Sequence, residues 1–162
     1  MAQVKNSMSE KRFWLMKSEP SVFSIGDLSR AKNQVSGWDG VRNYQARNYI
    51  KEMKPGEGVL FYHSNAEPPG IVGIAEIVRA AYPDPTQFEP KNIHYDPKSK
   101  KEAPIWFQVD VRFVKAFKGL LALEDLRRSP ALSSMALFKL SRLSVQPVTK
   151  AQWDKILKLA SA

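Results

Sequence analysis

The sequence predicts an α+β fold in one domain, a small curved β-barrel flanked by helices. Strand-like and helix-like segments follow one another irregularly, which differs from the strict strand–helix–strand order of a parallel sheet and favours a mostly antiparallel one. Residues 107–113 alternate apolar and polar side chains, the pattern of a strand with one buried face. A chain of 162 residues that is 43% hydrophobic has the size and composition of a single globular domain.

The first third of the chain predicts one strand and two helices. Residues 13–16 are a short apolar run that stops before a Glu-Pro pair, as expected of a buried strand. A short helix is expected over residues 24–31, with Ser24 as its N-cap. A longer helix over residues 43–53 shows apolar residues at helical spacing, and Asn43 is its expected cap.

The middle of the chain predicts most of the sheet. Strands are expected over residues 58–64, 70–81 and 105–117, because these runs are rich in β-branched and aromatic residues and are bounded by glycine or proline. Residues 82–104 are rich in proline and lysine, so we expect a long exposed excursion there.

The last third predicts helices that pack around the sheet. Residues 123–128 and 131–137 are expected to be short helices. Residues 149–160 form an amphipathic pattern, and Thr149 with Gln152 makes a capping box at its start.

Composition excludes several classes of site. The chain has no cysteine, which rules out disulfides, a cysteine nucleophile and thiolate-bound zinc. Its two histidines, His63 and His94, are far apart in the sequence, so we expect no metal and no cofactor, and we expect His94 to be solvated. No apolar run approaches the length of a membrane span. We therefore expect a cytoplasmic monomer, nuclear in a eukaryote, with a disordered leader over residues 1–11 and the domain over residues 12–162.

Catalytic signatures are missing as well. The sequence has no phosphate-binding glycine loop, no zinc-protease motif and no nucleophile elbow. His63 and Ser64 are neighbours at the end of an expected strand, where successive side chains point to opposite faces. No catalytic residue is assigned and no enzyme is predicted. An enzyme acting on nucleic acid or a nucleoside, and an adaptor that binds a small metabolite, remain the alternatives.

The charge of the chain points to a polyanionic partner. The net charge is +9, and residues 90–162 carry fourteen basic and six acidic side chains. Such an excess favours nucleic acid, although many small basic proteins bind nothing specific. Lys98, Lys100 and Lys101 in the long excursion, together with Arg47, are predicted to contact the nucleic-acid backbone.

One segment, residues 37–48, differs from an ordinary core element. Trp38 lies between glycines in an expected loop, and Arg42 and Asn43 follow where a helix begins. An aromatic face, a guanidinium group and free backbone amides suit base stacking and phosphate contact. In the alternative interpretation Trp38 closes the end of the barrel and Arg42 pairs with Asp39. The residues alone leave both interpretations open.

The same segment carries a family resemblance. WDGVRNYQARN at 38–48, MKSEP at 16–20, LFYHSN at 60–65 and GIVGIAEIV at 70–78 together resemble the EVE domain family, over about residues 12–160. The resemblance implies a PUA-like fold. It also implies a non-enzymatic reader of modified bases in DNA or RNA, similar to the YTH domains that hold N6-methyladenine in an aromatic cage.

The resemblance also implies residue roles. Lys17, Ser18 and Glu19 stand where YTH-type domains contact the base edge, Trp38 matches the first cage tryptophan, and Asp39 lies at the pocket rim. The predicted ligand-binding set also includes two residues of the segment 37–48 and four residues at the strand end that forms the opposite pocket wall. These are Arg42, Asn43, Tyr62, His63, Ser64 and Asn65.

The second cage tryptophan of YTH domains has no evident counterpart here. The strand with Glu76 is followed by Ile77 and Val78, and the next aromatic residue is Tyr82. The predicted pocket is therefore only partly aromatic, which leaves modified cytosine or another base open as the ligand.

Overall fold

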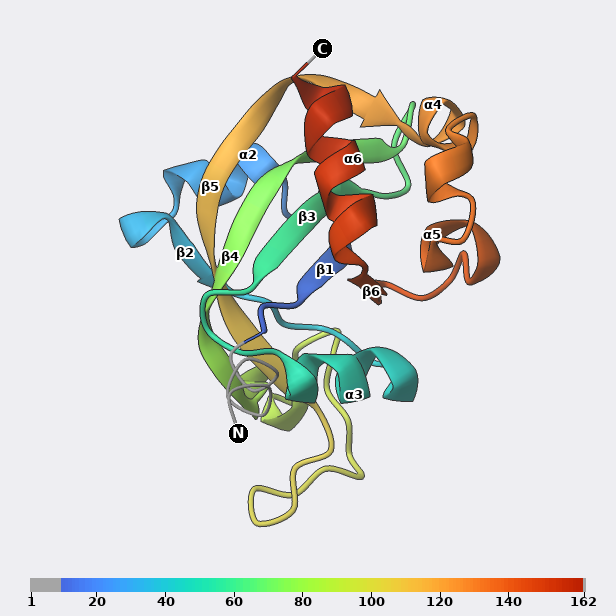
Figure 1. The fold of residues 1–162 in the computed structure, drawn as a ribbon. Coiled ribbons are helices and arrows are strands. Elements are labelled where there is room, and N and C mark those ends of the chain that lie inside the picture. Colours follow the sequence, from blue (N-terminus) through green and yellow to red (C-terminus); the bar gives the residue numbers. More distant parts are fainter. Residues whose placement is uncertain (1–9, 162) are drawn as a thin grey trace.

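The computed structural model describes residues 10–161, so most of the expected leader lies outside the described residues. These residues form one six-stranded sheet with five α-helices around it (Figure 1). The strands are β1 (Phe13–Ser18), β2 (Val35–Gly37), β3 (Gly58–His63), β4 (Gly70–Pro83), β5 (Phe107–Ala122) and β6 (Val145–Val148). The helices are α2 (Ile25–Arg30), α3 (Tyr44–Glu52), α4 (Leu123–Arg127), α5 (Ala136–Lys139) and α6 (Lys150–Ala160).

The strand order is β2-β5-β4-β3-β1-β6. Only β1 and β3 pair in parallel, because the helices α2 and α3 lie between them in the chain, and all other neighbours are antiparallel. Register shifts along the β4–β5 pair mark bulges, which bend these two long strands (Figure 1). The α+β class is confirmed, but the barrel is not: β2 and β6 remain the two edges of an open sheet over residues 10–161.

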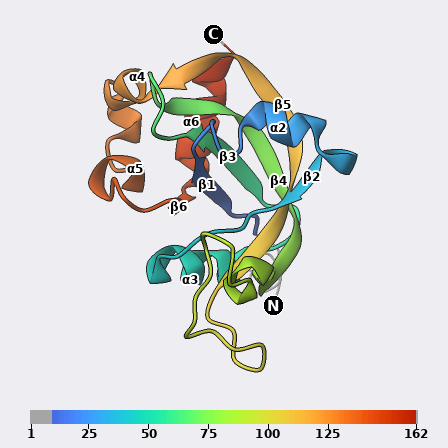
Figure 2. The ribbon, with the colours of Figure 1, turned by 180° about the vertical axis from the view of Figure 1, so that it is seen from behind.

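Both faces of the sheet are covered. Side chains alternate along β1, so Trp14 and Met16 join one core with α2 and α3, whereas Phe13 and Leu15 join a second core with α4, α5 and α6. Seen from behind, α2 and α3 lie on the near side of the sheet (Figure 2). The site described below lies on this side.

Local signals in the sequence located α2, α3 and α6 well. The helix expected over residues 131–137 is wrong, because this stretch holds a 3-10 turn at Pro130–Leu132 and only the first residues of α5. Ser24 and Thr149 accept hydrogen bonds in complete capping boxes, and Asn43 accepts the backbone N–H of Ala46. The strands β2 and β6 were not predicted, because three or four residues are too few to show a period. No helix among residues 10–161 is long and apolar enough to cross a membrane.

The expected excursion over residues 82–104 is only partly exposed. Its beginning forms a buried turn of 3-10 helix at Pro85–Phe88, and Gln87 donates to the carbonyl oxygens of Asp84 and Trp106. The side-chain oxygen of Gln87 accepts from the backbone N–H of Trp106 and the hydroxyl of Ser99. One buried amide thus ties both ends of the excursion together.

Candidate ligand pocket

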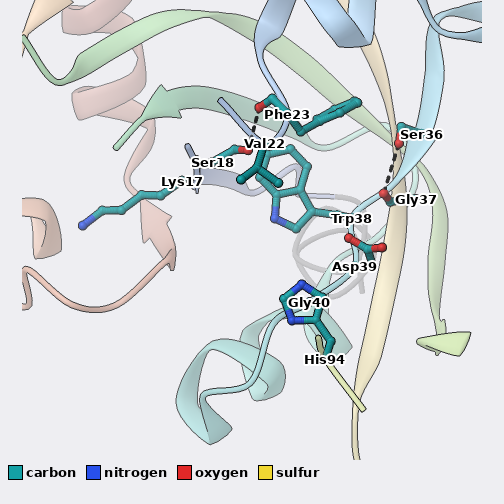
Figure 3. A pocket seen from close by; sticks show the side chains of 10 residues that line it. All are labelled: Lys17, Ser18, Val22, Phe23, Ser36, Gly37, Trp38, Asp39, Gly40 and His94. Atoms are coloured by element: carbon teal, nitrogen blue, oxygen red, sulfur yellow. Dashed lines mark hydrogen bonds between the residues drawn. The ribbon is translucent and has the colours of Figure 1, made fainter. Parts of the chain in front are cut away.

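A recess of about 370 Å³ opens on the side of the sheet that carries α2 and α3 (Figure 3). Its volume lies within the roughly 300–1,000 Å³ typical of small-ligand pockets. The walls come from the end of β1, the turn before α2, the strand β2 with the segment after it, and one residue of the long excursion. The lining residues are Lys17, Ser18, Val22, Phe23, Ser36, Gly37, Trp38, Asp39, Gly40 and His94.

Trp38 forms the aromatic wall of this pocket. Its backbone N–H donates to the carbonyl of Val109, which continues the pairing of β2 with β5. Its ring meets the Phe61 ring edge-on at 5.2 Å between centroids, and the residue is only 7% exposed. No hydrogen bond with another described residue engages its indole N–H. Trp38 is therefore both a packed core residue and a pocket surface, so the two interpretations of the sequence are not exclusive.

Arg42 is committed to the fold. Its guanidinium forms an ion pair with Asp84 at 3.0 Å, and the Asp84 side chain is completely buried. The remaining N–H groups donate to the carbonyls of Val41 and His94 and to the hydroxyl of Thr86. The alternative pairing of Arg42 with Asp39 is wrong, since Asp84 takes that place. Arg42 does not line the pocket and acts behind its wall.

The two aspartates beside this segment have opposite ionisation behaviour. Burial raises the pKa of Asp39, and the neighbouring Asp84 raises it further. Burial also opposes ionisation of Asp84. However, hydrogen bonds from Thr86, the Gly40 N–H and Arg42 outweigh that effect and lower its pKa overall. His94 and Arg42 act in the opposite direction on Asp39 but do not outweigh these two effects, so the pKa is raised at Asp39 and lowered at Asp84.

His94 belongs to the pocket, which corrects the expectation that it is solvated. Its ring lies against Gly40, where a Cβ atom would come within 2.6 Å of the imidazole Nε2. Gly40 also has a φ of +81°, a backbone conformation that favours glycine. The Arg42 guanidinium holds the His94 carbonyl at 2.8 Å and 3.0 Å, so the support network positions this residue.

The ends of β1 and β3 form a hydrogen-bonded wall. The Ser18 hydroxyl donates to the carbonyl of Phe23, and the Ser18 carbonyl accepts the N–H of Ser64. The side-chain amide of Asn65 donates to the Glu19 carboxylate at 3.1 Å. Of these predicted residues only Ser18 lines the pocket. Ser64, Asn65 and Glu19 stabilise the turn that carries Val22 and Phe23.

His63 lies behind the pocket wall. Its Nε2 atom accepts the N–H of Ile25 at 3.1 Å, and its ring meets the ring of Phe61 edge-on. Burial lowers the pKa of His63, while Asp27 acts in the opposite direction. This neutral imidazole links β3 to the start of α2 and does not pair with Ser64.

Three other predicted ligand residues are used elsewhere. Tyr62 is buried in the core on the opposite face of the sheet. Asn43 caps α3 and lines a separate recess with Leu140 and Arg142. Lys17 lines the pocket, but its ammonium group donates a hydrogen bond to the carbonyl of Ser141. Burial lowers the pKa of Lys17.

The second aromatic wall comes from Phe23, which the sequence analysis missed. Phe23 lines the pocket and packs against Phe61. Tyr82, the next aromatic residue after Ile77 and Val78, does not line the pocket, and its hydroxyl hydrogen-bonds Asp110 and Gln108.

The predicted backbone contacts divide into two groups. Arg47 donates to the carbonyl of Ile105 and to the Asn48 side chain, and its guanidinium lies over the Tyr44 ring. A second group in the excursion is exposed, and none of its ammonium groups forms an ion pair with another described residue. This group is Lys98, Lys100 and Lys101. Over residues 10–161 no cluster of three or more His, Asp or Glu residues could hold a metal ion.

Comparisons with known proteins agree with this architecture. Residues 12–159 match the family model of the EVE domain. Thymocyte nuclear protein 1 of Mus musculus is 49% identical over 164 residues, which cover 91% of this chain and 73% of that protein. The family match includes every residue that lines the pocket.

Solved structures extend the comparison. A hypothetical protein from Leishmania major superposes with a TM-score of 0.91 at 46% identity, covering 94% of this chain and 96% of that one. The human THYN1 protein in complex with 5-methylcytosine-containing DNA has a TM-score of 0.89 at 46% identity, covering 94% and 99%.

Proposed function

The chain belongs to the EVE domain family, and from this premise we propose that it binds DNA and holds one modified base in the Trp38 pocket. The pocket carries the proposal: the aromatic ring of Trp38 and the carboxyl group of Asp39 line the same recess of suitable size. The human THYN1 complex with 5-methylcytosine-containing DNA supports the choice of DNA and makes 5-methylcytosine the first base to test.

The chemistry of the lining fits this base. A cytosine ring presents an exocyclic amino group, which carboxylates accept, and Asp39 supplies such a carboxylate. Trp38 supplies the stacking surface for the base. Phe23 and Val22 give apolar contact surface for the added methyl group.

We propose binding without catalysis. Neither serine in the pocket donates its hydroxyl to a general base. Ser18 donates to the carbonyl of Phe23, and Ser36 donates to the carbonyl of Gly37. A serine nucleophile requires a neighbouring general base that takes its proton. Mass spectrometry of a methylated oligonucleotide after long incubation with the protein should find it unchanged. A new product would favour the enzyme alternative.

The decisive experiment measures affinity for duplexes that differ in one methyl group. We expect tighter binding to DNA with a central 5-methylcytosine than to the unmethylated duplex, by fluorescence anisotropy. Stacking on one aromatic ring contributes roughly 1–3 kcal/mol, so Trp38→Ala should weaken binding by about one to two orders of magnitude. Trp38→Phe should lose less, because a smaller ring face remains.

Trp153→Ala is the matched control. Trp153 stacks on Phe13 at 4.5 Å between centroids, in the core on the opposite face of the sheet. Its removal should lower the melting temperature without changing the affinity of the folded protein. Equal affinity for methylated and unmethylated DNA, or unchanged affinity in Trp38→Phe and Trp38→Ala, would contradict the proposed function.

The lysines of the excursion are proposed to contact DNA phosphates. Each neutralised phosphate contributes about −0.9 to the slope of log affinity against log salt concentration. Replacing Lys98, Lys100 and Lys101 by alanine should make this slope shallower and leave the preference for the methylated base unchanged. Lys155→Ala with Lys158→Ala on α6 is the control, and it should not change the slope. An unchanged slope in the triple variant would place the phosphates elsewhere.

A further inference from the structure

Resting on the proposed function, we propose that Val22 is the wedge that enters the duplex and fills the space left by the extruded base. Val22 lines the pocket, yet it is 75% exposed. The Val22 and Trp38 side chains both line the recess (Figure 3). A branched apolar side chain therefore projects into solvent beside the place where an extruded base would enter.

Hydrogen bonds on both sides of Val22 hold the turn that carries it. The Glu19 carbonyl accepts the N–H groups of both Val22 and Phe23 at 2.9 Å. The Ser18 hydroxyl holds the Phe23 carbonyl, and Asn65 holds the Glu19 carboxylate. The side chain at the tip contributes nothing to this hydrogen bonding. These bonds explain the shape of the turn but leave the exposed valine without a structural role.

The energetics of base extrusion give such a residue a function. Taking a base out of the stack costs a few kcal/mol of lost stacking and pairing. Many proteins that distort DNA insert an apolar side chain between base steps, which replaces part of the lost contact. Val22 needs no reorganisation to do so, because the turn already holds it at the pocket mouth and little conformational entropy is lost on binding.

Ile93 is the competing candidate. It is 91% exposed and directly precedes His94, which lines the opposite wall. Ile93 itself does not line the pocket, and the nearest backbone hydrogen bonds of its turn join its neighbours Asn92 and Tyr95. We therefore assign the wedge to Val22.

The test compares a paired duplex with the same methylated strand alone. An extruded base must leave a stack only in the duplex, so a wedge contributes only there. We expect Val22→Ser to weaken binding to the duplex about tenfold, as the loss of one buried apolar side chain predicts, with single-strand affinity unchanged within about twofold. A 2-aminopurine placed beside the 5-methylcytosine should also brighten less when Val22→Ser is bound at saturation than with the unmodified protein.

Two variants separate the outcomes. Val114→Ser removes a 49% exposed valine on β5 that does not line the pocket, and it should bind both DNAs normally. Trp38→Phe should weaken binding to both DNAs, and failure of that result would contradict the pocket itself. The wedge assignment would be overturned if Val22→Ser bound the duplex normally or lost equal affinity for both DNAs. A duplex-specific loss in Ile93→Ser instead of Val22→Ser would also overturn it.

Discussion

Trp38 and Arg42 lie four residues apart in one glycine-bordered segment, but the fold uses them in opposite ways. Trp38 places one side of its ring in the pocket and keeps its indole N–H unengaged among the described residues. The guanidinium of Arg42 donates hydrogen bonds to Asp84, to Thr86 and to two backbone carbonyls behind the pocket. The segment therefore builds a binding surface with its first half and the support of that surface with its second.

The two carboxyl groups of this region repeat the contrast. Asp84 is buried with three partners that favour its charge, whereas Asp39 borders the pocket without comparable compensation. A carboxylate that lacks partners in the free protein is available to a ligand that donates hydrogen bonds. Support groups should consequently respond to substitution mainly in stability and contact groups mainly in affinity, whereas Trp38, which is also packed against Phe61, should respond in both.

The largest effect is expected at the support. Asp84→Ala leaves the partly buried Arg42 without its anion and frees the Gly40 N–H and the Thr86 hydroxyl. Breaking a buried, hydrogen-bonded pair typically costs about 3–5 kcal/mol of stability. Urea unfolding at pH 7 measures this loss in the free energy of unfolding. Asp154→Ala, which removes an exposed ion pair on α6, should cost less than about 1 kcal/mol. Equal losses would show that the network is not a support.

A smaller effect is expected where support and pocket meet. Gly40→Ala and Gly56→Ala both place a side chain at positive φ, at +81° and +94°. Each should therefore lose about 1 kcal/mol from backbone strain. Only Gly40→Ala also forces a Cβ atom against His94, since nothing lies within 4 Å of a Cβ at Gly56.

DNA binding separates these two glycine variants. Gly40→Ala should lose more stability and also affinity for methylated DNA, because His94 must leave the pocket wall. Gly56→Ala should lose stability alone. Matching affinities for the two variants would remove His94 from the site.

The difference between surface and support also explains what could be predicted from the sequence. The caps at Ser24, Asn43 and Thr149 are local, so a few neighbouring residues suffice to identify them. Trp38 was identified because glycines flank it. Arg42 does not line the pocket, and no local pattern reveals its pairing with Asp84, which lies 42 residues away.

The missed pocket residues follow the same rule. His94 and Val22 reach the pocket from separate loops, and their places depend on how the excursion and the β1–α2 turn fold back. Gly40 carried the one indirect signal, because a loop glycine often marks a close approach, here by the His94 ring. The strands β2 and β6 were too short to show periodicity, so the open edges of the sheet were also missed.

The smallest effect, and the most specific one, concerns the sign of the pH dependence at the two aspartates. An unfolded aspartate titrates at about 3.9. The pKa of folded Asp84 is lowered, so its stabilisation is complete above the unfolded pKa and is lost as the pH falls through the folded one. The pKa of folded Asp39 is raised, so its ionised form destabilises the fold above the raised pKa, and this penalty disappears as the pH falls toward 3.9.

Replacing Asp84 by asparagine and replacing Asp39 by asparagine should therefore shift stability in opposite directions. At pH 7, Asp84→Asn should be less stable than the unmodified protein, while Asp39→Asn should be equally or slightly more stable. The gain at Asp39 should stay below about 0.5 kcal/mol, because that residue is exposed to solvent. Both differences should shrink on acidification, which urea unfolding between pH 3 and pH 7 measures. A clear loss of stability in Asp39→Asn at pH 7 would mean that Asp39 belongs to the support, and the division of the segment into surface and support would fail.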